Sequence, residues 1–201
     1  RGLHSLAIKN FGILGDVDVK LERLNVLVGP NGSGKSTLLR VLAFLGDAAR
    51  TQLASAVELH GGIERVRTRQ AWGAGKAAPG WITIHVKAEI TTRAHAKALD
   101  EYTLSFRPLR VVSNRDESAR LAIEHRELFK FKRTAAAGRR ITLEGGTLTY
   151  FDEGKKGKQQ SLSLDKEAFG LAVLPQLGPE QGGAEVRKIQ ELFTKFRVFD
   201  V

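Results

Sequence analysis

The sequence contains no cysteine, and this absence excludes disulfide bonds and metal sites built on thiolates. It also contains no methionine and opens on Arg1, although a natural chain begins with methionine, so we expect a start that has been trimmed. No apolar run approaches the roughly 20 residues that a helix needs to cross a bilayer. The opening stretch, Arg1-Gly2-Leu3-His4, does not have the apolar core of a secretory signal. We therefore expect a cytoplasmic protein with no membrane partner.

The hydrophobic content is sufficient for one domain. The 201 residues are 42% hydrophobic, and a chain of this length buries roughly 70% of the surface that it exposes when unfolded. Such a chain forms an ordinary core without metals or cross-links. Its 32 Lys and Arg residues exceed its 22 Asp and Glu residues, which gives a formal net charge of +10 and a pI near 10.1.

Alternating apolar residues at the start predict an antiparallel pair of strands. Leu6, Ile8 and Phe11 alternate with polar neighbours, and a second alternation follows over residues 17–21. The next run, residues 24–28, is almost entirely apolar, which is typical of a strand that is buried on both faces. We therefore expect a third strand there.

The apolar run leads directly into Gly29-x-x-x-x-Gly34-Lys35-Ser36, which fits the pattern of a phosphate-binding loop, or P-loop. The context also fits this interpretation, because an apolar predicted strand precedes the loop and an amphipathic predicted helix follows it. The alternative is a glycine-rich turn between a strand and a helix that happens to contain a lysine.

A P-loop holds phosphate through backbone and side chain together. Its glycines let the backbone curl, so the N–H groups of residues 32–35 point at phosphate oxygens while the helix N-terminus adds partial positive charge. Lys35 is predicted to neutralise the β- and γ-phosphates, Ser36 to ligate Mg²⁺, and Thr37 to bond the α-phosphate. The candidate nucleotide-binding residues are Gly29, Pro30, Asn31, Gly32, Ser33, Gly34, Lys35, Ser36 and Thr37.

The middle of the chain, residues 81–164, is predicted to be a β-rich subdomain, because apolar and polar residues alternate from Ile82 to Ile90 and again from Tyr102 to Phe106. Further strands are predicted at Leu121 to Glu127, Ile141 to Leu143, Leu148 to Phe151 and Ser161 to Leu164. The lysine-rich run 154–158 is predicted to be a solvated hairpin tip. Helices are predicted from Asp47 to Leu59 and from Ala184 to Phe196, with a last strand at 198–201.

Three stretches resemble the opening of SMC/RecF-like ABC-type ATPase heads and of the related OLD-like and AAA family ATPases of bacteria. They are Leu6-Ala7-Ile8-Lys9-Asn10-Phe11, Val17-Asp18-Val19, and the run from Leu24 to Leu39. The resemblance implies that Asn31 contacts the region of the γ-phosphate. It also implies heads that dimerise around two nucleotides in DNA maintenance or phage defence. Several members have a basic residue that reaches the phosphates directly after the Asn-Phe pair, whereas this chain has Gly12.

A hydrolysing head of this type needs further motifs, namely a Walker B strand ending in Asp-Glu, a Leu-Ser-Gly-Gly-like signature and a switch histidine. The most similar segment, Leu148 to Glu153, is interpreted as a hairpin strand because Thr149 interrupts its apolar run and a return strand is predicted after it. Asp200 is a weaker candidate. The candidates for a glutamine that senses Mg²⁺ are Gln70, Gln159 and Gln176. No catalytic residue is therefore assigned, and we expect a second lobe of the same protein to supply the missing motifs.

The basic residues suit contact with a DNA backbone, and they equally suit an ordinary solvated surface. They are Arg65, Arg67, Arg69, Arg107, Arg110, Lys130, Lys132, Arg133, Arg139, Arg140, Lys155, Lys156 and Lys158. The five histidines lack metal-ligand spacing and are interpreted as structural: His4, His60, His85, His95 and His125.

The sequence thus predicts an α/β P-loop NTPase lobe over residues 1–201, with a mixed sheet and an antiparallel β subdomain. Such a lobe is expected to bind and hydrolyse ATP with Mg²⁺ and to homodimerise through the nucleotide. The alternative is a nucleotide-binding regulatory or partner-docking module that does not hydrolyse ATP. A P-loop kinase is disfavoured because a strand pair before the loop is unusual in kinases. An ABC transporter head is disfavoured because no aromatic residue stands ahead of the loop to stack on adenine.

Overall fold

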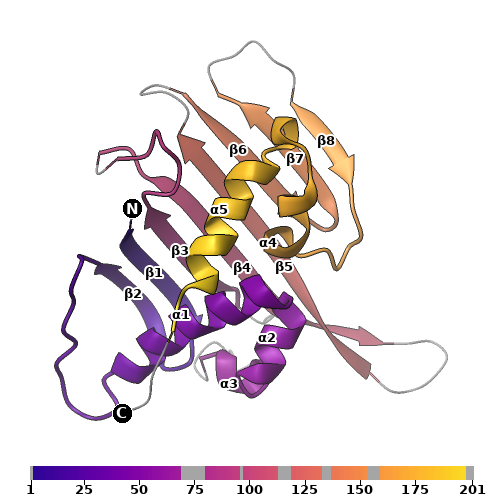
Figure 1. The fold of residues 1–201 in the computed structure, drawn as a ribbon. Coiled ribbons are helices and arrows are strands. Elements are labelled where there is room, and N and C mark those ends of the chain that lie inside the picture. The colour runs from indigo at the N-terminus through magenta and orange to yellow at the C-terminus, as the bar shows by residue number, and fades with distance from the viewer. Residues whose placement is uncertain are drawn as a thin grey trace.

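The structure, a computed structural model, describes residues 2–68, 80–95, 97–112, 119–132, 137–153 and 159–197. Within these ranges the strands form one antiparallel sheet in the order β2-β1-β3-β4-β5-β6-β7-β8 (Figure 1). The strands are β1 (Leu3–Phe11), β2 (Leu14–Lys20), β3 (Ile82–Ala88), β4 (Asp100–Val112), β5 (Ala119–Lys132), β6 (Gly138–Glu144), β7 (Thr147–Asp152) and β8 (Gln160–Ser163). The strands of the β-rich middle therefore continue the sheet that β1 and β2 begin.

One face of this sheet carries the core. In β3 every second residue is buried, from Ile82 to Ala88, because successive side chains of a strand point to opposite faces. The helices cover that buried face (Figure 1). They are α1 (Lys35–Arg50), α2 (Leu53–Leu59), α3 (Ile63–Val66), α4 (Gly170–Val173) and α5 (Gly183–Thr194), with short 3-10 turns at Leu174–Gln176 and Pro179–Gln181.

Aromatic rings join the two long helices to the sheet. Phe44 of α1 lies with its ring centroid 5.4 Å from that of Phe11 and 5.5 Å from that of Phe106. Phe193 of α5 lies 5.5 Å from Tyr102 of β4 in the same measure. Offset and edge-to-face ring pairs at such distances stabilise a core by about 0.5 to 1.5 kcal/mol beyond their buried area. The rings thus fix α1, whose first residue follows the loop at 29–34, against the centre of the sheet.

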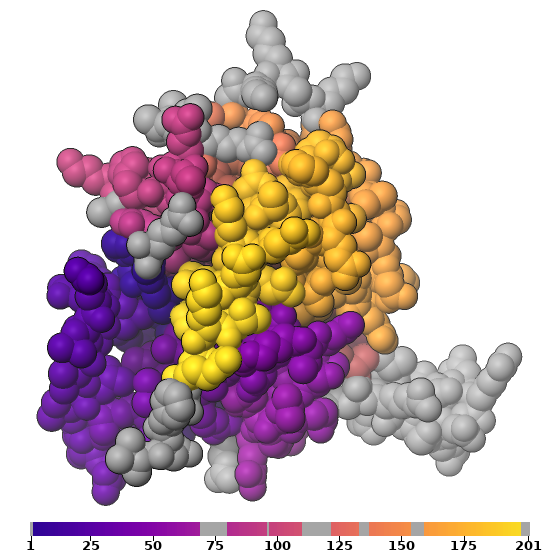
Figure 2. Space-filling view, in the orientation of Figure 1, coloured from indigo at the N-terminus to yellow at the C-terminus, as the bar shows by residue number. Residues whose placement is uncertain are grey.

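Helices α1 and α5 also pack on each other. In the space-filling view of Figure 2 the yellow surface of α5 borders purple surface from the N-terminal part of the chain. The Arg50 guanidinium at the end of α1 donates to the carbonyl oxygens of Thr194, at 2.5 Å, and Phe196, at 3.1 Å. Arginine at a helix C-terminus satisfies carbonyls that have no partner within their own helix. The predicted final helix is confirmed, with its bounds at Gly183–Thr194.

The expected strand at residues 24–28 is wrong: this segment has no regular secondary structure and is largely exposed, with Leu24 at 83%, Val26 at 77% and Val28 at 88% exposure. A strand requires a hydrogen-bonded neighbour, and no described strand lies beside this segment. The expected strand at 24–28 does not join the sheet, and every described strand pair is antiparallel. The sheet, which was expected to be mixed, is therefore antiparallel throughout its described part.

The hairpin interpretation of the segment ending at Glu153 is confirmed. β7 pairs with β6 on one side and with β8 on the other, where Leu148 lies opposite Leu162 and Tyr150 opposite Gln160. The predicted tip at 154–158 and the predicted strand at 198–201 lie outside the described residues. The helix expected from Asp47 to Leu59 is instead the end of α1 followed by α2, with a break at residues 51–52. No helix in the described ranges is long and apolar enough to span a membrane.

Candidate functional site

The loop predicted to hold phosphate runs from Gly29 to Gly34 and ends where α1 begins at Lys35. Gly32 and Gly34 have φ values of +80° and +99°, in the left-handed region that favours glycine. The first turn of α1 contains no acidic side chain. No carboxylate of that turn therefore neutralises the partial positive charge at the N-terminus of the helix. The left-handed backbone conformation of this turn therefore follows directly from the placement of its glycines.

The turn between β1 and β2 packs against this loop. A Cβ atom on Gly34 would lie 2.6 Å from Cδ2 of Leu14, and a Cβ atom on Gly12 would lie 2.7 Å from Cγ2 of Thr37. Real Cβ atoms do not approach other carbons so closely, because the interior of a protein is already close-packed. Glycine at both positions thus lets the strand turn support the start of α1 directly.

Lys35 lies over the loop's own backbone. Its ammonium donates to the carbonyl oxygens of Gly29, at 2.6 Å, and Pro30, at 2.7 Å, and to Oγ of Ser33, at 3.3 Å. These three acceptors place the positive charge inside the curve of the loop. A phosphate group seated there would meet a lysine that is already positioned to form a charge-assisted hydrogen bond.

Ser36 is exposed at the start of α1, beside Lys35. Its hydroxyl fits Mg²⁺, because this ion binds hard oxygen ligands and takes one or two protein groups together with phosphate oxygens and water. Among the described residues no group of three or more His, Asp or Glu side chains is arranged to hold a metal. Ser36 is accordingly the candidate metal ligand of this site.

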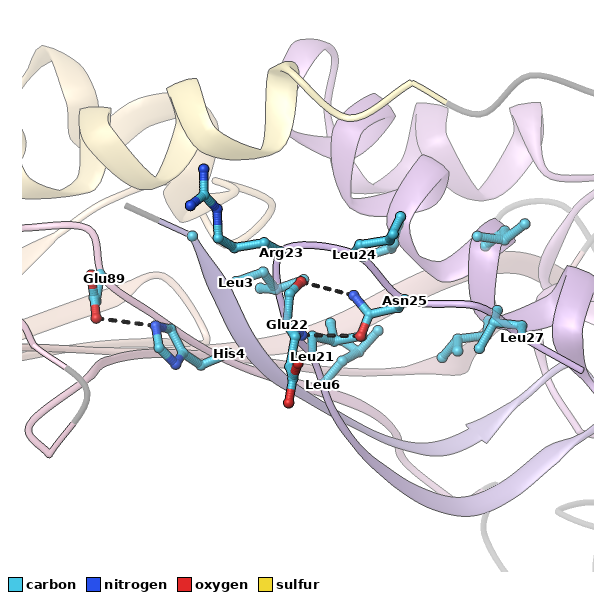
Figure 3. A pocket seen from close by; sticks show the side chains of 14 residues that line it. Leu3, His4, Leu6, Leu21, Glu22, Arg23, Leu24, Asn25, Leu27 and Glu89 are labelled. Atoms are coloured by element: carbon cyan, nitrogen blue, oxygen red, sulfur yellow. Dashed lines mark hydrogen bonds and ion pairs between the residues drawn. The ribbon is translucent and has the colours of Figure 1, made fainter.

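The apolar segment before the loop borders a groove of about 1250 Å³ that is lined by β1, α1 and residues between 21 and 27 (Figure 3). The Asn25 side chain fixes the entry of this segment, since it accepts from the Glu22 amide at 3.0 Å and donates to the Glu22 carbonyl at 2.8 Å. Leu24 and Leu27 reach over the groove, and Leu39 and Leu42 of α1 line it from the opposite side. An apolar surface next to the loop therefore lies open to solvent.

A second cavity lies beside the first turn of α1, at Thr37. It has a volume of about 370 Å³, and its lining residues are Gly12, Ile13, Thr37, Arg40, Glu64, Arg65, Arg67 and Thr68. We call it the arginine pocket. Sequence reasoning noted Arg65 and Arg67 only as members of a general basic surface and did not single out Arg40. Arg40 is well separated in the sequence from Arg65 and Arg67, and the three arginines form a group only in the folded chain.

The Asp-Glu pair at the end of β7 lies far from this loop. The Asp152 carboxylate accepts from Nε of Arg139 at 2.8 Å, and the Glu153 carboxylate pairs with Arg140 at 3.4 Å. β7 stands five strand positions from β1 in the sheet, or about 24 Å at the usual spacing of strands. These carboxylates are structural partners of arginines. Asp200, the other candidate, lies outside the described residues.

Apart from Arg65 and Arg67, which line the arginine pocket, the candidate glutamines and basic residues line neither cavity near the loop or lie outside the described residues. Gln159 and Gln176 are exposed and line neither cavity beside the loop, and Gln70 is not described. Arg107 pairs with Glu124 at 2.6 Å and Lys130 with Glu101 at 3.2 Å. Residues 69, 133, 155, 156 and 158 and the side chain of residue 110 fall outside the description. Part of the basic surface is therefore neutralised within the chain itself.

The histidines make local contacts. Nε2 of His60 lies 2.9 Å from Oδ2 of Asp47, Nε2 of His4 lies 3.1 Å from Glu89, and that of His85 lies 3.3 Å from Glu101. Burial lowers the pKa of His85, against the opposing effect of the Glu101 carboxylate.

A buried carboxylate on β5 was not identified from the sequence. Burial raises the pKa of Glu127 to about 7, although hydrogen bonds from the Gly170 amide, the Tyr102 hydroxyl and the Leu171 amide act in the opposite direction. The Tyr102 hydroxyl donates at 2.8 Å and the Leu171 amide at 3.3 Å. Glu127 thus joins β5 to the start of α4.

The profile of the AAA ATPase domain family matches residues 2–130, well over half of the 201 residues, and the chain belongs to that family. The resemblance to SMC/RecF-like and OLD-like ATPases is confirmed.

Two particular relatives can be named. The OLD nuclease of Thermus scotoductus is 50% identical over 46 residues, a match that covers 22% of this chain and 9% of that protein. A solved structure of an SMC ATPase, studied for ATP-driven dimerization and DNA-stimulated activation, aligns with 79% of this chain and 73% of its own at 14% identity. Its TM-score is 0.37, which is too low to support an argument about this chain.

Proposed function

We propose that the chain binds ATP with Mg²⁺ through residues 29–37. The observation that carries this proposal is the position of Lys35, whose ammonium lies within the curve of a glycine-rich loop at the N-terminus of α1. Membership of an ATPase family supports the same conclusion.

Each part of the loop then has one task. The N–H groups of residues 32–35 donate to phosphate oxygens, and the Lys35 ammonium exchanges the carbonyls of Gly29 and Pro30 for the β- and γ-phosphates. Ser36 holds Mg²⁺, which supplies charge neutralisation at the phosphates when it is bound. Thr37 bonds the α-phosphate, and Asn31 faces the γ-phosphate as the family resemblance implies.

We further propose a second lobe of the same protein that covers the apolar segment before the loop. Leu24, Val26 and Val28 are more than three-quarters exposed, and contiguous exposed apolar surface of this kind marks a place where another element packs. A strand added beside residues 24–28 would pair their backbone groups and bury these side chains. The same lobe would carry the carboxylate that orients the hydrolytic water.

On this basis we propose ATP hydrolysis and homodimerisation through the nucleotide as the working cycle, with DNA as a partner. The basic balance of the chain supports DNA contact, although Arg107, Lys130, Arg139 and Arg140 are engaged with carboxylates of the chain. A nucleotide-binding module without hydrolysis is the second candidate. The structural role of Glu153 favours it, because that residue was the most plausible hydrolytic carboxylate in the sequence.

The test of ATP binding is Lys35→Ala, measured by titration calorimetry with ATP and Mg²⁺. A charge-assisted hydrogen bond contributes about 1.5 to 3 kcal/mol, so the affinity should fall by about 10- to 150-fold. The contacts of Lys35 lie within the loop, so the melting temperature should stay unchanged. The matched control is Lys20→Ala, which removes an exposed lysine at the end of β2. Equal ATP affinity in the folded Lys35 variant and in the wild type would refute the proposal.

A further inference from the structure

The arginine pocket lies beside the first turn of α1 at Thr37, the residue assigned to the α-phosphate, and next to the β1–β2 turn. Three arginines line it against one glutamate, Glu64, so its lining carries a net positive charge. None of its lining residues is aromatic. Its charge distinguishes it from the apolar groove lined by Leu24 and Leu27, with which it shares no lining residue.

Backbone hydrogen bonds hold the wall of this pocket in place. The Gly12 amide donates to the Val66 carbonyl at 2.8 Å, and the Thr68 amide donates to the Asn10 carbonyl at 3.0 Å. The Thr68 hydroxyl donates to the Leu14 carbonyl at 3.2 Å. Residues 66–68 are therefore attached to the end of β1 and to the β1–β2 turn, which brings Arg67 and the neighbouring Arg65 to Thr37.

The arginines reach the pocket from two elements and differ in exposure. Arg67 is only 4% exposed and forms a bridge with Phe11 through the backbone. Arg65 is exposed, and its stem packs over Gly61, where a Cβ atom would lie 2.6 Å from its Cδ. Arg40 comes from α1 and donates to the His60 carbonyl at 3.3 Å. The pocket is thus a built site whose charged wall depends on the fold.

We propose that the arginine pocket receives the base and ribose of the nucleotide whose triphosphate lies in the loop. This inference rests on the proposed function and extends it to the nucleoside end. A ligand that leaves the loop at the α-phosphate passes Thr37, and Gly12 offers no side chain to block its path. The guanidinium plane of arginine stacks on a base as an aromatic ring does, and it also pairs with phosphate and ribose oxygens.

The size and chemistry of the pocket agree with this occupant. A volume of about 370 Å³ lies within the usual range of small-molecule pockets, about 300 to 1000 Å³. The hydroxyl-bearing Thr37 and Thr68 and the carboxylate of Glu64 add polar groups to the cationic wall. Guanidinium stacking in this pocket would also compensate for the absence of an aromatic stacking residue ahead of the loop.

The experiment compares ATP with inorganic tripolyphosphate, which has the phosphates of ATP but no nucleoside. Both affinities are measured by calorimetry in the presence of Mg²⁺ for the wild type and for Arg65→Ala and Arg40→Ala. Loss of one stacked guanidinium should lower the affinity for ATP by about tenfold. Tripolyphosphate reaches only the loop, so its affinity should change by less than about twofold in both variants.

The control variant is Arg93→Ala, which removes the same charge from an exposed turn after β3. That turn lies beyond the Ala88 end of β3, which pairs with Leu3, at the opposite end of β1 from Phe11. This substitution should leave the affinities for both ligands unchanged. It thereby separates a local contact from the general effect of removing one positive charge.

The result that decides the inference is the ratio of the two affinities. A ratio of ATP affinity to tripolyphosphate affinity that falls by less than about threefold in Arg65→Ala overturns it. Since Arg65 is exposed, this variant decides the outcome even if Arg40→Ala fails to fold. Lys35→Ala tests the loop separately, because it should weaken both ligands alike. Unchanged binding in that variant would reject the loop rather than the arginine pocket.

Discussion

The buried carboxylate of Glu127 should make the stability of the fold depend on pH in an unusual direction. Its oxygens accept from the Tyr102 hydroxyl and from the amides of Gly170 and Leu171. Gly170 is required at its position, since a Cβ atom there would lie 2.6 Å from Oε2 of Glu127. The carboxylate therefore connects β5 to α4, the helix that precedes α5 and its packing on α1.

The sign follows from the protonation of the two states. The ordinary pKa of a glutamate is 4.5, and burial raises the pKa of Glu127 to about 7 in the folded protein. Below pH 4.5 the side chain is protonated in both states. As the pH rises from 4.5 to 7, the unfolded chain releases this proton while the folded protein keeps it, so the free energy of unfolding falls. Above pH 7 the contribution is constant.

The magnitude follows from the same two values. The whole interval corresponds to about 3 kcal/mol, at about 1.4 kcal/mol for each pH unit. About 2 kcal/mol of this falls between pH 5 and pH 7, where urea denaturation is practical. With a typical dependence of 1 to 3 kcal/mol per molar urea, that loss shifts the urea midpoint by about 1 M.

The assay measures urea midpoints of the wild type and of Glu127→Gln at several pH values from 5 to 7. Glutamine keeps the shape of the side chain but does not titrate, so the variant should lack the fall of about 2 kcal/mol. Nε2 of His125 lies 4.0 Å from the carboxylate. Burial lowers its pKa, so its contribution to stability has the opposite slope, and it is present in both proteins.

Glu144→Gln is the matched control for this assay. Glu144 is an exposed carboxylate on β6 that pairs with Arg126 at 2.8 Å. Its variant should keep the pH dependence of the wild type. If Glu127→Gln and the wild type lose stability in parallel from pH 5 to pH 7, the burial argument for Glu127 is refuted.

Two further predictions concern hydrolysis and DNA. Glu153→Gln should leave ATP binding and any residual hydrolysis unchanged in single-turnover and steady-state assays, since Glu153 pairs with Arg140 and follows β7, which stands five strand positions, or about 24 Å, from β1. Hydrolysis that disappears in this variant would contradict the hairpin interpretation. DNA affinity measured against salt should fall with a log–log slope of about −0.9 for each phosphate neutralised and show little sequence preference. An affinity that is flat between low and physiological salt would point to another partner.

The sequence predicted those parts of the fold whose signal is local. In β3 and β6 the alternation of buried and open residues reflects packing against a single layer of helices, so their positions were predicted from polarity alone. β5 is longer than expected, Ala119–Lys132, because Phe129 and Phe131 continue the buried alternation past Glu127. The charged glutamate within that buried row concealed the continuation.

The segment at 24–28 shows where local signal fails. Its composition is that of a strand buried on both faces, but the strand conformation needs a partner whose identity no local pattern contains. The arginine pocket was missed for a related reason. Arg40 and Arg65 are brought together by backbone bonds between residues 66–68 and the β1–β2 turn, and these bonds leave no periodic trace in the sequence.

The β1–β2 turn links the loop to the arginine pocket. Because Gly34 has no side chain, Leu14 packs against it, and because Gly12 has none, the methyl group of Thr37 packs there. The turn therefore contacts the residue before α1 and the first turn of α1. Through its Gly12 amide the turn also holds Val66, and with it the segment that carries Arg67. A movement of the β1–β2 turn would therefore displace the loop at 29–34 and the arginine wall together. Binding of a nucleotide that contacts both should in turn fix this hairpin against α1.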